Sequence, residues 1–332
     1  MARSRRTTPD QRLSLLRQRL KDLPSEAMIA ELRSALSDES NFVVEQAAKI
    51  VRVEVHRELS LDLVSAYLRF LNDGAEYDKG CRAKLAITEA LLALDFEEPE
   101  FWLAGMKYRQ HEPVWSGSVD TATEVRGASA FGLVRSRLVA PSDLLIALTD
   151  LLADFEAGAR CHAARAIAAA ALPGCAALLR LKATLGDKRD EVLGACFTGL
   201  LELDAHRNLD FVASFLKSAS DTAIEAALAL GSSRNRDAVL LLLNACERCS
   251  SEHVEPFWIS LGLSRQPEAV SFLISRIETA KPDGVHAIRA LAPIRSYDNI
   301  AERVLIAVQA SGRREFAAAH RTEFLAKETG PQ

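Results

Sequence analysis

The sequence predicts an all-α protein made of repeated helical hairpins, and three observations lead to this prediction. Apolar residues make up 48% of the 332 residues and aromatic residues only 6%, with 16 Gly and 11 Pro, a composition that favours helices over sheets. Leu, Ile and Val recur every three or four residues, the period of a helix with one buried face. Similar segments also recur at regular intervals, which is typical of repeat proteins.

The chain starts with a basic arm over residues 1–20. Residues 1 to 21 hold seven Lys and Arg against one Asp, a net charge of +6, so the remaining 311 residues carry −10 of the total of −4. We expect this arm to be a solvated cap that leads into a first helix from about Pro9. Contact with nucleic acid through Arg3, Arg5 and Arg6 is the alternative, and the acidic body of the chain weighs against it.

Two alternating series of amphipathic segments follow over residues 21–330, which we predict to form a single array. The second helices of the predicted hairpins are expected to start at Asn41, Gly80, Val119, Ala157, Arg189, Ser220, Ser251, Asp283 and Arg313. The intervals are 39, 39, 38, 32, 31, 31, 32 and 30 residues, which separates longer repeats (25–156) from shorter ones (157–327). About nine helical hairpins are therefore predicted.

Turn residues support the boundaries between these segments. Pro24, Pro99, Pro141, Pro173 and Pro267 lie where one hairpin should end and the next helix begin. Proline suits the first turn of a helix, because its missing N–H would have no partner within the helix there.

This pattern resembles the HEAT-like repeat family over roughly residues 25–325. The resemblance rests on small and aliphatic residues at helical spacing with an Asp in the turn, as in "AGARCHAARAIAAAA" from Ala157. The C-terminal two thirds, with a period near 31 residues, resemble the short variant named after phycobilin lyase subunits. The resemblance implies a right-handed α-solenoid with a concave inner surface. It also implies an interaction scaffold in most members, and action on cofactors or DNA in a minority.

One segment, "KYRQHEPVWSGSVD" (107–120), interrupts the helical pattern. We predict a polar loop that leads into a helix near Val119, on the same edge of the array as "NDGAEYDKG" (72–80). Recognition sites of repeat proteins are often built on such loops, and exposed aromatic and Arg side chains are typical anchors. The predicted binding residues are Tyr77, Asp78, Lys79, Arg109, Gln110, His111, Glu112, Trp115, Asp120 and Arg126.

A structural interpretation of this segment stays open. In it, Trp115 packs the loop onto the array, Glu112 and Asp120 cap helices, and Arg126 pairs with Asp120 or Asp78. We nevertheless expect a non-catalytic scaffold that recognises a protein partner through the concave face and this loop edge, without a cofactor.

The alternative is an enzyme or a small-molecule binder centred on residues 77–80 and 107–120. His111, Glu112, Asp78 and Asp120 could supply acid and base groups, as in a DNA-glycosylase-like or phycobilin-lyase-like protein. A pocket on which His111, Glu112, Asp78 and Arg126 converge would favour this alternative, whereas solvated side chains would favour a scaffold.

Other kinds of site have weak signals. Cys246, Cys249 and His253 have the spacing of the start of a zinc site, with His286 as a possible further ligand, but the pattern is incomplete and no metal site is expected. No stretch is apolar enough to span a membrane, and the basic start is not followed by an apolar leader region. We therefore expect a cytoplasmic protein that does not enter the membrane.

Overall fold

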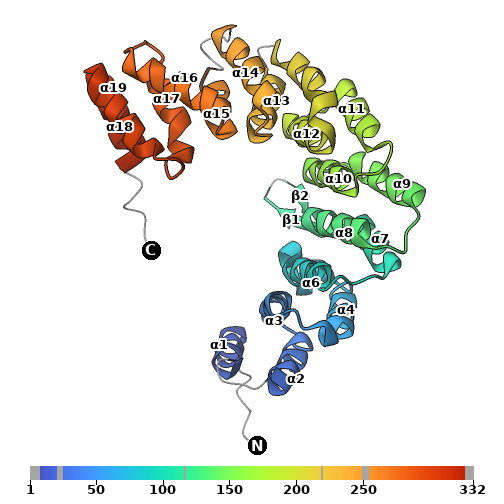
Figure 1. Ribbon diagram of the computed structural model, residues 1–332. Helices are drawn as coiled ribbons and strands as arrows, with labels where there is room; N and C mark the ends of the chain where they lie inside the picture. The colour runs from blue at the N-terminus through green and yellow to red at the C-terminus, as the bar shows by residue number, and fades with distance from the viewer. Residues whose placement is uncertain (1–7, 21–24, 116, 218–219, 249–253, 326–332) are drawn as a thin grey trace, which may run out of the picture. The chain divides into compact units, whose positions relative to one another are not determined.

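The computed structural model describes residues 8–20, 25–115, 117–217, 220–248 and 254–325. These residues form nineteen α-helices and one two-stranded sheet, so the prediction of an all-α protein is confirmed (Figure 1). The arm residues Arg3, Arg5 and Arg6 lie outside the described residues, and the first helix starts at Pro9 as predicted.

Backbone contacts divide the chain into two compact units, Met1–Leu172 and Pro173–Gln332. The α-helices of the first unit are α1 Pro9–Leu20, α2 Ser25–Leu36, α3 Asn41–Glu54, α4 Ser60–Arg69, α5 Gly74–Tyr77, α6 Arg82–Ala93, α7 Pro99–Lys107, α8 Thr123–Arg135, α9 Pro141–Leu152 and α10 Ala157–Ala170. Strands β1 His111–Val114 and β2 Gly117–Asp120 lie between α7 and α8, and short 3-10 turns span Arg57–Leu59 and Lys79–Cys81.

The first unit is built from two series of helices. Helices α3, α6, α8 and α10 pack side by side in this order, and α2, α4, α7 and α9 each pack on the member of this series that follows it in the chain. Helices α3 and α10 start at the predicted residues Asn41 and Ala157, whereas α6 and α8 start two and four residues later than predicted.

The second unit has the same alternation. Its α-helices are α11 Cys175–Leu185, α12 Asp190–Ala213, α13 Asp221–Ser232, α14 Arg236–Arg248, α15 Val254–Ser264, α16 Pro267–Glu278, α17 Gly284–Leu291, α18 Ile300–Ser311 and α19 Arg314–His320. Short 3-10 turns span Ser214–Lys217 and Ala292–Ile294, and a π-helical turn spans Arg321–Leu325. Helices α12, α13, α15, α17 and α19 contact one another in this order.

Small residues allow neighbouring helices of the second unit to approach closely. A Cβ atom on Gly231 of α13 would lie 2.2 Å from the carbonyl oxygen of Ser260 on α15. A Cβ atom on Gly262 of α15 would lie 2.0 Å from the carbonyl oxygen of Ala290 on α17. Because no real side chain fits at these distances, glycine is required at both contacts.

Helix starts follow the predicted turn chemistry. Pro99, Pro141 and Pro267 occupy the first turns of α7, α9 and α16, where proline costs no hydrogen bond. Most of the buried apolar side chains of the first unit lie on its helices, as on α3, α6 and α10.

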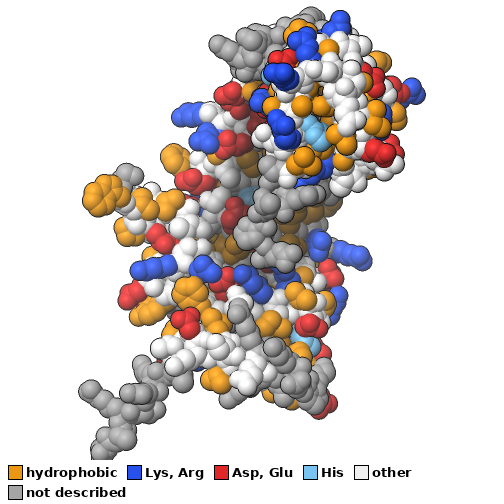
Figure 2. Space-filling model, turned by 90° about the vertical axis from the view of Figure 1, so that its left-hand side faces the viewer, with side chains coloured by type: hydrophobic (Ala, Val, Ile, Leu, Met, Phe, Trp, Pro, Cys, Tyr) orange, Lys and Arg blue, Asp and Glu red, His pale blue; other side chains and the backbone are white. Residues whose placement is uncertain are grey.

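One face of the molecule has mixed charge. Figure 2 shows acidic and basic side chains interspersed with apolar ones on the face that it presents. Within the described part of the chain, no helix combines the length and the apolar character that crossing a membrane requires.

Candidate functional site

The segment predicted as a polar loop forms a β-hairpin instead. Strands β1 and β2 pair antiparallel, with His111 opposite Asp120 and Val114 opposite Gly117. The prediction of a loop, and of a helix starting near Val119, is therefore wrong. Gly117, the first residue of β2, has a φ of 140°, a value that favours glycine.

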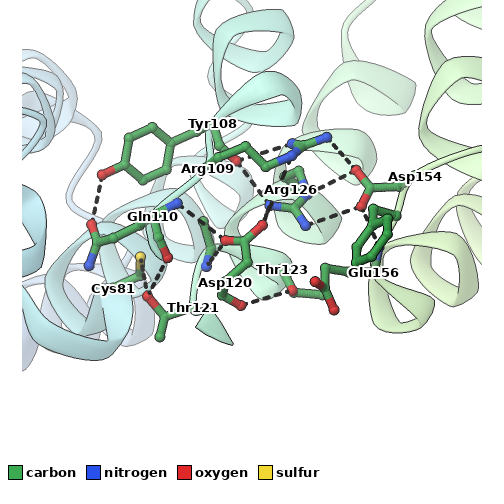
Figure 3. A network of polar contacts seen from close by, with 12 residues as sticks. Cys81, Tyr108, Arg109, Gln110, Asp120, Thr121, Thr123, Arg126, Asp154 and Glu156 are labelled. Atoms are coloured by element: carbon green, nitrogen blue, oxygen red, sulfur yellow. Dashed lines mark hydrogen bonds and ion pairs between the residues drawn. The ribbon is translucent and has the colours of Figure 1, made fainter. Parts of the chain in front are cut away.

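The Asp120 carboxylate fixes the base of this hairpin to helix α8. Its Oδ1 accepts hydrogen bonds from the backbone N–H groups of Gln110 (3.2 Å) and Ala122 (2.9 Å), and its Oδ2 lies 2.7 Å from Nη1 of Arg126 (Figure 3). Burial raises the pKa of Asp120, but these hydrogen bonds and the Arg126 charge outweigh it, so the pKa is lowered. Of the two partners predicted for Arg126, Asp120 is confirmed.

A second buried carboxylate, Asp154 in the turn between α9 and α10, extends the network. Arg126 Nη2 donates to its Oδ1 (3.3 Å), and Arg109 Nη2 donates to its Oδ2 (2.5 Å). Arg160 donates to the Asp154 carbonyl oxygen (2.9 Å). Asp154 is not among the site residues predicted from the sequence. A signal was present, because a cation follows the turn Asp by six residues in Asp120/Arg126 and again in Asp154/Arg160.

Glu112 connects the hairpin to the preceding repeat. Its Oε1 accepts hydrogen bonds from the Gly80 N–H, the Gln110 Nε2 and the Thr121 Oγ1, each at 2.7 Å. Burial raises the pKa of this carboxyl group, but the hydrogen bonds prevail and lower it. Glu112 therefore joins two turns. The structural interpretation of the sequence predicts a helix cap at this residue, and Glu112 does not have that role.

Asp78 lies in a third buried ion pair, with Lys84 of α6. Lys84 Nζ is 2.8 Å from Asp78 Oδ2, and neither side chain is exposed. Asp78 also accepts the backbone N–H groups of Ala83 (2.9 Å) and Lys84 (3.1 Å) at the start of α6, and the Asn41 side-chain amide (3.3 Å). It is a helix cap and a link to α3, and Lys84 is a partner that the sequence analysis did not identify.

Three other predicted site residues lie at the surface around this base. Tyr77, His111 and Lys79 are exposed. Trp115, at the tip of the hairpin, is fully exposed, with a relative exposure of 106%. The prediction that Trp115 packs the segment onto the array is wrong, because both flanking strands project away from the helices and the side chain meets no core.

The structure thus divides the predicted residues into two groups. Asp78, Gln110, Asp120 and Arg126 are buried, Glu112 is half-buried, and the half-exposed Arg109 pairs with Asp154. The four solvent-exposed side chains, Tyr77, Lys79, His111 and Trp115, lie around these buried groups. Asp78 and Arg126 belong to separate ion pairs, and His111 is exposed, so these residues do not converge on a common pocket.

A cleft of about 310 Å³ lies between α7 and α9 on the same unit. Its lining is Leu103, Met106, Lys107, Arg109, Asp143, Ile146, Ala147, Asp150, Leu151 and Asp154. One side of this cleft is therefore apolar, and its charged lining consists of two cations, of which Arg109 is paired with Asp154, and three carboxylates.

Among the residues that the structure describes, no group of three or more His, Cys, Asp or Glu side chains is placed so that it could hold a metal ion. Cys246 is buried at the end of α14, whereas Cys249 and His253 lie outside the described residues.

Comparison with models of known protein families gives no match, and no curated protein is similar to the chain at a significant level. The HEAT-like resemblance therefore rests on the repeat pattern of the sequence.

Proposed function

We propose that the protein is a non-catalytic binding scaffold that recognises a protein partner through the turns at one edge of its first unit. The observation that carries the proposal is the contrast at this edge between buried ion pairs, formed by Asp78, Asp120 and Asp154, and the exposed aromatic side chains of Tyr77 and Trp115. Exposed Trp and Tyr residues commonly supply most of the binding energy at protein interfaces. A base held by ion pairs keeps such anchors in place before the partner arrives, which lowers the entropic cost of binding.

Acid–base catalysis fits the same residues less well. A general acid that works near neutral pH needs a raised pKa, whereas Glu112 and Asp120 have lowered pKa values. Each carboxylate already accepts several hydrogen bonds from the protein, which leaves little capacity for a substrate. Recognition through the concave face that the resemblance implies stays a prediction.

The test is affinity capture from a native lysate with the double variant Tyr77→Ala/Trp115→Ala. The matched control, Leu185→Ala/Tyr297→Ala, removes two exposed apolar side chains from the second unit. We expect a partner that wild type and control retain and the first variant loses. Equal retention by all three proteins would contradict the proposal.

A further inference from the structure

A cleft of about 480 Å³ lies between α18 and α19, in the second unit. Leu305 and Val308 of α18, Ala317 of α19 and Leu325 of the π-helical turn form its apolar part. Leu305 and Leu325 have relative exposures of 41% and 54%. Exposed apolar side chains that line a cleft are typical of a binding site.

The cleft lies at the position where a further pair of helices would pack. In the second unit α14 contacts α16 and α15 contacts α17, and in the same way α16 contacts α18 and α17 contacts α19. Helices α18 and α19 are the last described pair (Figure 1). No residue of α16 or α17 lines the cleft, so it opens on the side of this pair that faces away from the preceding repeat. In an array of repeats, this is the side that the next helices cover.

The ionisable side chains that line the cleft are all basic. They are Arg313, Arg314, His320 and Arg321, and no carboxylate is among the lining residues. The His320 ring is buried and stacks on Phe324 at 5.0 Å between ring centroids, and burial lowers its pKa. His320 is therefore neutral near pH 7 and belongs to the apolar part. The positive charge comes from the three arginines, in contrast to the cleft between α7 and α9, which includes three carboxylates.

Two of these arginines keep their charge available to a ligand. Arg313 pairs with Glu315 at 3.5 Å and donates to the carbonyl oxygen of residue 280 (3.0 Å). Arg314 and Arg321 are exposed, and over residues 254–325 neither forms an ion pair. Glu323 pairs with an arginine of α17 (3.9 Å). An apolar cleft with two unpaired guanidinium groups is complementary to a ligand that is both apolar and anionic.

We infer that the cleft between α18 and α19 binds an amphipathic helix of a partner protein whose polar face is acidic. The apolar face of this helix would cover Leu305, Val308 and Leu325, and its carboxylates would lie beside Arg314 and Arg321. A helix is the occupant because helices cover the corresponding side of the two preceding pairs. An apolar helix face laid into a groove is a common mode of protein recognition.

The lining of the cleft distinguishes this partner from a single-stranded nucleic acid, which arginines also bind. Single strands are held by aromatic side chains on which the bases stack, in addition to positive charge. No Phe, Tyr or Trp lines the cleft. The site lies in the second unit and does not depend on the proposed function, which concerns Tyr77 and Trp115 of the first unit.

The test is fluorescence anisotropy of the full chain with three labelled fifteen-residue peptides. The first contains Leu at helical spacing on one face, Glu on the opposite face, and Ala elsewhere. The second has Lys in place of each Glu, and the third has the composition of the first with its Leu residues distributed around the helix. We expect the first peptide to bind at least about tenfold more tightly than either of the others.

Substitution of the two unpaired arginines tests the position of the site. Arg314→Gln/Arg321→Gln should weaken binding of the acidic peptide about tenfold. The matched control, Arg207→Gln/Arg236→Gln, removes two exposed arginines of α12 and α14 in the same unit and should leave binding unchanged.

The apolar contact has its own pair of variants. Leu305→Ser should weaken binding of the acidic peptide about fivefold or more, because the apolar face of the helix loses its contact. Leu240→Ser, at an exposed position of α14, is the control and should bind as wild type does.

Equal affinity for the acidic and the basic peptide, or binding that Arg314→Gln/Arg321→Gln leaves unchanged, would overturn the inference. So would a failure of the acidic peptide to bind at about 1 mM, or tighter binding of a twelve-nucleotide oligothymidine. Binding that requires removal of residues 326–332 would assign the cleft to the chain's own C-terminal segment instead. A wild-type dimer in analytical ultracentrifugation that Arg314→Gln/Arg321→Gln abolishes would assign it to a second copy.

Discussion

Arg126 on α8 and Asp154 in the turn before α10 form a hydrogen bond of 3.3 Å across 28 positions of the chain, and both side chains are buried. Arg126 also binds Asp120 in its own repeat. The positive charge of one buried guanidinium group is therefore shared between two buried carboxylates, and this sharing couples neighbouring repeats.

Removal of Arg126 should destabilise the first unit strongly. Arg126→Ala leaves two buried carboxylates without their shared cation, and we expect a loss of about 3–5 kcal/mol in the free energy of unfolding. Arg109→Ala removes a half-exposed partner of Asp154 and should cost about 1 kcal/mol or less. Urea unfolding followed by circular dichroism measures the free energy of unfolding of both variants. Equal losses would show that the burial of an arginine does not determine its contribution to stability.

Acid should loosen the attachment of the hairpin. Glu112 and Asp120 have lower pKa values in the folded protein than the ordinary values, which apply to the unfolded chain. Their contribution to stability is therefore fully present above about pH 4 and is lost as the pH falls through their folded values. We expect Glu112→Gln to be less stable than wild type at pH 7, and the difference to shrink below about pH 4.

Unfolding free energies measured between pH 7 and pH 3 provide the check on this prediction. The control Glu278→Gln changes an exposed carboxyl group of the second unit and should show little difference from wild type at any pH. A stability deficit of Glu112→Gln that persists unchanged at pH 3 would argue against the assigned role of the carboxylate.

The helices could be predicted from the sequence because their apolar spacing is local. The predicted starts at Asn41 and Ala157 agree with the structure, since each depends only on a few neighbouring residues. The hairpin could not be predicted in this way. Its strands have four residues each, and its base depends on contacts such as Gly80 with Glu112, which lie 32 positions apart.

The candidate site shows the same division between local and distant information. Exposed Tyr77 and the pairing of Arg126 with Asp120 were predicted from the polarity and spacing of neighbouring residues. The pairing of Asp154 with Arg109 and Arg126 was not, because both arginines belong to the preceding repeat. Pairing across repeats depends on how the helices stack, which a single segment does not specify.

Glycine at helix contacts in the second unit should not tolerate a methyl group. In an exposed helix, Gly→Ala stabilises by about 0.5–1 kcal/mol. At Gly262 the added Cβ would lie 2.0 Å from the Ala290 carbonyl oxygen, so Gly262→Ala should instead destabilise by about 1–3 kcal/mol. Thermal unfolding gives the sign directly, and a higher midpoint for the variant would mean that α15 and α17 are not in such close contact.

Glu225 on α13 should oppose folding at neutral pH. Burial, together with the negative charges of Glu191, Asp190 and Asp221, raises its pKa. A carboxyl group whose pKa is raised in the folded state favours folding when protonated, and this contribution is lost as the pH rises through the folded value. Glu225→Gln should therefore stabilise the protein at pH 7.

This gain from Glu225→Gln should disappear below about pH 4, where wild-type Glu225 is itself protonated. Glu202→Gln, at an exposed position of α12, is the matched control. Differential scanning calorimetry at pH 7 and pH 4 compares the three proteins, and equal midpoints for wild type and Glu225→Gln at pH 7 would be inconsistent with the raised pKa.

The hairpin also bears on how the protein avoids unwanted assembly. A two-stranded sheet that projects from a helical protein has two outer edges, and each could recruit a strand from another molecule. Pro113 lies in the middle of β1 and has no N–H group to donate. Growth of the sheet into a fibril is therefore hindered from the β1 side, even though the tip carries an exposed tryptophan.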